Sequence, residues 1–88
     1  MFKKLRSVRL PYIRQGLIYF TCINYTIQPE HVKQKILNTC LAAGGEYYGA
    51  LFDMMTHGKT ATAVSIEHYI SEATAIRIRK KFYEIWEF

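Results

Sequence analysis

The sequence predicts an all-α fold, a small helical bundle of four to five helices within one domain. Three observations lead to this prediction. Apolar residues recur at helical spacing along most of the chain, capping residues and glycines separate the periodic segments, and no second convincing strand is found. A chain of 88 residues, half of them hydrophobic, suits one modest core. We therefore expect a basic N-terminal arm at residues 1–10 and a single helical domain at residues 11–88.

The first helix is expected within residues 11–28, where the pattern is least clear. The aromatic and β-branched residues of this segment also suit a strand, but a lone strand would have no partner. Pro11 favours a first helical turn. The residues before it lack a clear period, so we expect a flexible or loosely docked arm. The apolar stripe predicted for this first helix contains Ile13, Leu17, Phe20 and Ile27.

The rest of the domain divides into four helices whose ends carry recognisable signals. Proline and an acidic residue favour a helix start, glycine favours a stop, and a serine or threonine hydroxyl caps the first turn. By these signals the helices cover residues 28–45 (Pro29 and Glu30 to Gly44 and Gly45), 46–57 (ending at Gly58), 60–69 (capped by Thr60) and 72–87 (capped by Ser71).

The last of these helices separates an apolar face from a basic one. Phe82 and Ile78 belong to the apolar face, and we expect both to be buried against the helix of residues 46–57. Helical spacing adds Ala75, Ile85 and Trp86 to this face. The opposite side carries Ala73, Arg77, Lys80, Lys81 and Glu84.

Positive charge is concentrated near the two ends of the chain. The formal net charge is +5, and nine of the twelve basic residues lie within residues 3–14 and 77–81. Residues 15–76 hold three basic and five acidic residues. This distribution suits a polyanionic partner that approaches from one side.

The last two helices and the tight turn between them follow the layout of a helix-turn-helix over about residues 60–87. In that motif the second helix lies in the DNA major groove, here the helix of residues 72–87. Small side chains such as Ser65 and Ala75 would let the two helices cross closely. A hydroxyl residue at the start of the second helix leaves backbone N–H groups free to hold a phosphate.

The segment "LFDMMTHGKTATAVSIEHYISEATAIRIRKKFYEIW" also resembles the sigma-factor region-four-like helix-turn-helix of small phage and mobile-element regulators, including late-transcription activators. Two departures stand out. Tyr69 occupies a position where the family usually has glycine, which predicts a different turn geometry. His68 replaces an aliphatic core residue and Ile66 a polar one, which predicts a rotated or shortened first helix of the motif. The matching positions are Leu51, Phe52, Gly58, Lys59, Thr60, Val64, Ser65, Ile70, Ser71, Thr74, Ala75 and Arg77.

Arginine and lysine side chains on the outward helix face can bond guanine edges or neutralise phosphates. We expect base contacts from Thr74, Arg77 and Lys80. Phosphate contacts are expected from Lys59, Thr60, Ser71, Arg79 and Lys81, with Arg79 nearer the core flank, where it holds a backbone phosphate or an acidic neighbour. The arm residues Lys3, Lys4, Arg6 and Arg9 would follow the backbone or enter the minor groove, or serve only as a solubilising tail.

Signals for other classes of protein are missing from the sequence. The "AAGGE" stretch lacks the later residues of a phosphate-binding loop, and no nucleophile has a recognisable base, so we expect no enzyme and no cofactor. Cys22 and Cys40 lie in apolar patterns and are expected to be free thiols. Neither has a neighbour at metal-ligand spacing, so no metal site is expected. The polar residues that interrupt the early apolar run favour a cytoplasmic protein without a membrane segment.

These features together predict a DNA-binding protein whose partner is double-stranded DNA in the cytoplasm of a bacterial host cell. A role in transcription is what the resemblance implies. A homodimer is possible because palindromic sites usually require one, and the apolar first helix could supply its contact. The alternative is a protein-interaction module or inhibitor that docks on a host protein such as RNA polymerase or a defence nuclease.

Overall fold

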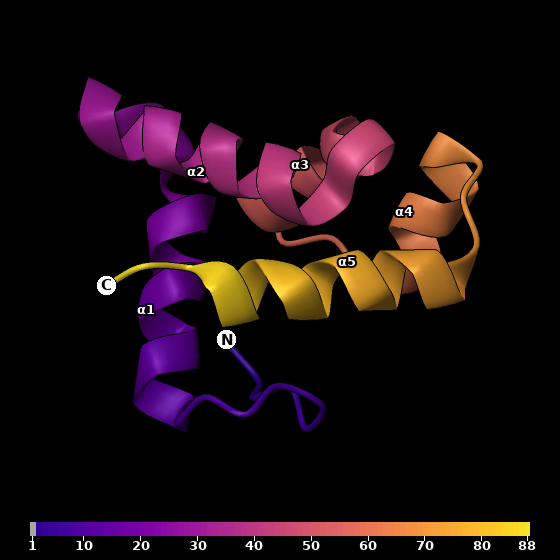
Figure 1. Cartoon of the computed structure of the whole chain (residues 1–88), viewed down its shortest axis with the longest axis horizontal. Coiled ribbons are helices and arrows are strands. Elements are labelled where there is room, and N and C mark those ends of the chain that lie inside the picture. The colour runs from indigo at the N-terminus through magenta and orange to yellow at the C-terminus, as the bar shows by residue number, and fades with distance from the viewer. Residues whose placement is uncertain (1) are drawn as a thin grey trace.

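Helices account for all the regular secondary structure in residues 2–88, the part of the chain that this computed structural model describes (Figure 1). The expected all-α fold is therefore confirmed. None of these helices has both the length and the apolar character needed to cross a membrane. The elements are α1 (Tyr12–Ile23), the 3₁₀ turn η1 (Tyr25–Ile27), α2 (Glu30–Gly44), the 3₁₀ turn η2 (Gly45–Tyr47), α3 (Tyr48–His57), α4 (Ala61–His68) and α5 (Glu72–Ile85).

The helix ends follow the local signals of the sequence. Thr60 Oγ1 accepts a hydrogen bond from Ala63 N at 3.1 Å and so caps α4. Gly58, which ends α3, has a left-handed φ of 62°, and a β-carbon there would lie 2.6 Å from Ile23 Cδ1. The left-handed backbone therefore favours glycine at this corner, and a β-carbon would in addition displace the end of the Ile23 side chain.

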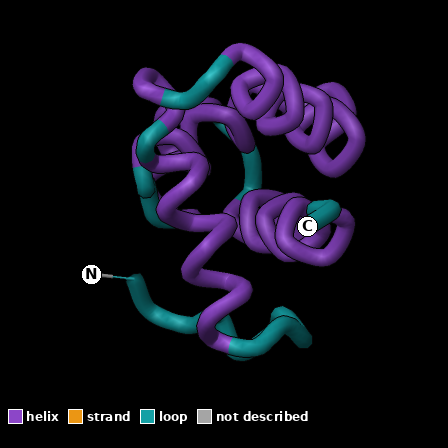
Figure 2. The backbone as a smooth tube through the Cα atoms, turned by 90° about the vertical axis from the view of Figure 1, so that its left-hand side faces the viewer, coloured by secondary structure: helices purple, strands orange, loops and turns teal. Residues whose placement is uncertain are grey.

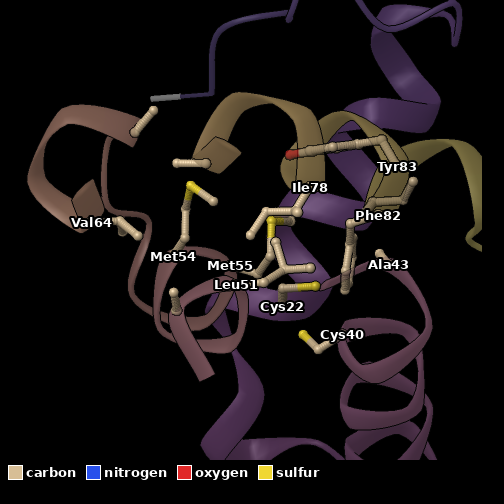
Figure 3. Close-up of a cluster of buried hydrophobic side chains, with 14 of the residues drawn as sticks. Cys22, Cys40, Ala43, Leu51, Met54, Met55, Val64, Ile78, Phe82 and Tyr83 are labelled. Atoms are coloured by element: carbon tan, nitrogen blue, oxygen red, sulfur yellow. The ribbon is translucent and has the colours of Figure 1, made fainter. Parts of the chain in front are cut away.

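The helix α5 runs along the length of the molecule, with α4 at its N-terminal end and α1 near the end where it finishes (Figure 1). Its most extensive neighbours are α2 and α4, and α3 also contacts it. Phe82 and Ile78 are fully buried, as expected (Figure 3). Both α2 and α3 pack against α5, and α2 does so more extensively than the expected α3. Tyr83 is also buried, which the helical pattern did not indicate.

The orientation of α1 differs from the expected one. The predicted core stripe faces solvent, and Ile13, Leu17 and Phe20 are 76%, 57% and 52% exposed. The buried side of α1 instead carries Ile18 and Cys22. Both sides of this helix are apolar, so the pattern alone could not distinguish them. Ile27, in η1, is also largely exposed.

The N-terminal arm is docked against α1 rather than flexible or loosely docked. Phe2 and Val8 are buried, and Phe2 packs on the rings of Tyr12 and Tyr19. The buried Gln15 side chain accepts a hydrogen bond from the Leu5 backbone N–H at 2.9 Å. Its amide group donates to carbonyl groups of the arm at Leu5, Val8 and Leu10. Figure 2, which faces the α1 end, shows the arm as the loop leading into this helix.

Candidate nucleic-acid interface

The turn between α4 and α5 is held in a compact geometry at residues 69–71. Tyr69 is 94% exposed and has φ 56° and ψ 42°, in the left-handed region. The backbone N–H groups of Tyr69 and Ile70 both donate to the carbonyl of Ser65. Tyr69 thus adopts a conformation that glycine favours, so the tyrosine does not open the turn. The preceding helix ends at His68, one residue earlier than the sequence predicted.

The outward face of α5 presents a set of basic side chains to solvent. Arg77, Lys80 and Lys81 are all exposed, and within residues 2–88 none of them has an ion-pair partner. The opposite face of the same helix is buried in the core. Ile76, which sequence reasoning did not select, is also exposed on this helix. The structure therefore fixes these three charges at the surface and leaves them free to meet an anionic partner.

Ser71 and Thr74 form a closed pair at the start of α5. Ser71 Oγ accepts from Thr74 N at 3.0 Å and donates to Thr74 Oγ1 at 2.7 Å. The Ser71 hydroxyl is thus used within the protein, while the hydroxyl proton of Thr74 remains available to an acceptor. A phosphate at this helix start would be met by the backbone N–H groups of the first turn.

Lys59 has a different environment from the lysines of α5. Its Nζ lies 2.9 Å from Asp53 Oδ2 and 2.9 Å from Glu67 Oε1. Hydrogen bonds to these two carboxylates, Asp53 first, raise the pKa of Lys59. Asp53 also contacts His57 and His68 at 3.0 and 2.9 Å. Asp53 and Glu67 therefore neutralise the charge of Lys59 within the domain, so Lys59 would attract a phosphate less strongly than an unpaired lysine.

A cavity of about 260 Å³ brings several of the expected phosphate contacts together. Lys59, Thr60 and Arg79 line it, and Lys3 of the docked arm completes its polar rim. Aromatic and methionine side chains form the remaining wall. No carboxylate of residues 2–88 lies within ion-pair distance of Arg79, so the acidic neighbour allowed for it is not found. Burial lowers the pKa of this half-buried guanidinium, although the nearby Tyr83 opposes the shift.

The arm adds further positive charge. Lys3, Lys4, Arg6 and Arg9 are exposed, although the residues between them anchor the segment. Because Lys3 and Arg79 line the same cavity, the arm lies beside α5. The docking of the arm was missed because its anchor, Gln15, is a polar residue that no apolar pattern selects. The anchoring role of this glutamine is apparent only in the structure, where its side chain forms four hydrogen bonds with the arm.

Comparison of the chain with protein-family models, with curated proteins and with solved structures finds no match. Across the described part of the chain, no group of three or more histidine, cysteine, aspartate or glutamate side chains is arranged to hold a metal ion.

Proposed function

We propose that the protein binds double-stranded DNA through a helix-turn-helix formed by α4 and α5, with α5 in the major groove. The observation that carries the proposal is the exposed basic face of α5, which has no ion-pair partner within residues 2–88 and lies opposite a buried apolar face. Arg77 and Lys80 occupy the side of the helix that would face base edges. Lys81, one turn beyond Arg77 along the same face of the helix, would meet the phosphate backbone.

Contacts outside α5 support the same partner. The N-terminus of α4 lies beside the cavity lined by Lys3 and Arg79, where positive charge and free backbone N–H groups would favour a phosphate. Arg79 has no carboxylate partner among the described residues, so an external anion would compensate its charge. We assign Lys59 a mainly structural role, because Asp53 and Glu67 already neutralise it.

A regulatory role follows from the resemblance to region-four-like regulators and is part of this proposal. Such a protein would act in transcription from phage or mobile-element promoters in the cytoplasm of a bacterial host, with RNA polymerase as a possible second partner. The short turn at Tyr69 and the two capped helices are compatible with this motif.

Binding to a random-sequence duplex across a salt series tests the proposal. The double variant Arg77→Ala/Lys81→Ala should bind the random duplex more weakly and reduce the log–log salt slope by about one, because Lys81 is the phosphate contact of the pair and each lost phosphate-neutralising contact removes roughly 0.9. The matched control is Lys33→Ala/Lys35→Ala on α2. Each double variant lowers the net charge by the same amount, from +5 to +3, so net charge alone cannot separate them.

The control should retain the binding and salt slope of the wild type. If the wild type does not bind duplex DNA even at low salt, the proposal fails. The alternative, docking of the basic helix on an acidic host protein, would then explain its charge. Equal losses in the two double variants would mean that general charge, and not the face of α5, attracts the duplex.

A further inference from the structure

The outer side of α1 is an apolar surface that the described chain leaves about half exposed. We define the α1 face by Tyr12, Ile13, Leu17 and Phe20, each about half or more exposed. These residues share one side of the helix and include no charged group. The largest apolar patches on monomers reach about 300–600 Å² and are often functional. We propose that the α1 face is the contact surface of a homodimer, which deepens the DNA-binding proposal by supplying its second half.

The α1 face contains both a hollow and a ridge. A cavity of about 440 Å³ opens beside Gly16 and is bordered by Ile13, Leu17 and Phe20. Ile13, 76% exposed, projects next to it. A surface that carries a projection and a recess side by side can pack against itself around a twofold axis, where each projection enters the recess of the other copy.

The size of the α1 face agrees with the needs of a stable dimer. Its four large side chains, each about half or more exposed, offer on the order of 500 Å² of apolar surface per copy, since an aromatic side chain alone covers about 150–250 Å². A standard interface buries about 800 Å² per partner, and about 65% of it is apolar in homodimers. The product of these two values is again about 500 Å².

Charge favours a second copy over a lipid surface. Each copy carries +5, but the α1 face holds none of it, so two copies can meet there without opposing like charges. Arg14, the basic residue of α1, lies 4.9 Å from the centre of the Phe88 ring and covers the chain end. It is therefore held by the protein instead of projecting toward lipid headgroups, as the basic residues of interfacial helices do.

The position of the α1 face suits a dimer on DNA. In Figure 1 α1 lies at one end of the long axis, and α4 with the start of α5 at the other. The long dimension of one copy is 31 Å. If the twofold axis lies at the α1 end, the distance between the two α5 helices of the dimer is less than twice this long dimension. This range includes the roughly 34 Å between successive major grooves on one side of DNA.

Sedimentation equilibrium without DNA tests the dimer independently of DNA binding. The wild type should show twice the monomer mass at micromolar concentrations. Ile13→Glu should raise the dimer dissociation constant by roughly a hundredfold, because symmetry places two carboxylates in the contact. Ile66→Glu on α4 is the matched control, since Ile66 is 69% exposed on another surface, and it should remain dimeric. Circular dichroism should show an unchanged helical content in both variants.

A second measurement locates the axis. Leu17→Cys, at the middle of the α1 face, should form a disulfide-linked dimer under mild oxidation, whereas Ile66→Cys should not. The native Cys22 and Cys40 are buried and do not compete. A wild type that stays monomeric up to about millimolar concentration, or an Ile13→Glu variant that dimerises as the wild type does, would overturn the proposal. So would Ile13-dependent binding to neutral phosphatidylcholine vesicles, which would identify lipid as the occupant. Loss of the dimer with retained duplex binding would leave the proposed function intact.

Discussion

His68 Nε2 and Asp53 Oδ2, fifteen residues apart in the sequence, lie 2.9 Å apart and join the end of α4 to α3. Asp53 also accepts a hydrogen bond from Lys59 and contacts His57. One carboxylate, 21% exposed, thus connects α3, the corner after it and the residue before the Tyr69 turn. This network therefore ties α4 to the end of α3.

The Asp53→Asn substitution should lower the free energy of unfolding at neutral pH, and in acid the variant and the wild type should be equally stable. Partial burial alone would raise the pKa of Asp53, but hydrogen bonds from Lys59 and His68, with the charges of Lys59 and His57, lower it below the ordinary value of 3.8. Because the pKa of Asp53 is lower in the folded than in the unfolded protein, its carboxylate stabilises the fold at every pH above the unfolded pKa. This stabilisation is lost as the pH falls through the folded pKa. We expect a cost of about 1 kcal/mol at pH 7, a drop of several degrees in Tm.

Thermal unfolding of both proteins between pH 7 and pH 2 measures this difference. The two curves should approach each other only below pH 3.8 and converge as the pH falls through the lowered folded pKa, where the wild-type carboxyl becomes protonated. Glu46→Gln, at an exposed acidic residue, is the control and should match the wild type throughout. A constant difference across the whole range would mean that the Asp53 charge contributes nothing.

Tyr69→Gly should stabilise the protein. The left-handed backbone of Tyr69 costs a non-glycine residue about 1–2 kcal/mol, and its side chain is almost fully exposed. After the greater entropy of an unfolded glycine is subtracted, a gain of about 0.5–1 kcal/mol remains. Urea unfolding checks this, with Tyr69→Ala as the control that keeps the strain and loses only the ring. Equal stability of the glycine and alanine variants would show that the turn is not strained.

Cys22 and Cys40 should react very slowly in the folded protein. Burial raises the pKa of both thiols to about 12, and the nearby Cys40 adds to the shift at Cys22. At pH 8 the thiolate fraction is then roughly a thousandfold lower than for a free cysteine of pKa about 8.5. Reaction with a chromogenic disulfide should be slow in buffer and rapid in guanidinium. Fast native labelling, or a loss of about two daltons without reductant, would contradict the free buried thiols.

Arg77→Ala and Lys81→Ala should weaken DNA binding in different ways if the proposed function holds. Arg77 is placed to reach a base edge, and its loss should cost about 1–3 kcal/mol on a selected site and relax sequence preference. Lys81 is placed to meet a phosphate, and its loss should weaken all duplexes equally and lower the salt slope by about one. Titration of a selected and a random duplex separates the two effects, with Lys33→Ala as the control. Identical behaviour of both variants on both duplexes would refute this division of roles.

The local features of the fold could be read from the sequence because each depends on neighbouring residues. Thr60 and Ser71 cap the helices that follow them, and Gly58 ends the helix before it. The two faces of α5 were also predictable in outline, since Ala75, Ile78 and Phe82 are buried and Arg77, Lys80 and Lys81 are exposed, although Ile85 is exposed against expectation. The burial of Phe82 followed from that separation.

Contacts between segments that are distant in the chain could not be predicted from the sequence. The sequence predicted a phosphate contact for Lys59, but the fold places the carboxylates of Asp53 and Glu67 beside it. The cavity that joins Lys3 to Arg79 depends on the docking of the arm, which rests on the hydrogen bonds of one buried glutamine.

The sequence by itself determined that the chain is helical, that Thr60 and Ser71 start α4 and α5, that Gly58 ends α3, and which face of α5 is basic. Those properties follow from backbone hydrogen bonding, capping and side-chain periodicity, all of which act within a few residues. Only the tertiary structure decided which apolar side of α1 enters the core. Ile18 and Cys22 are buried while Ile13 and Leu17 remain outside, because a core of this size accepts one side of the helix and the docked arm fixes its rotation.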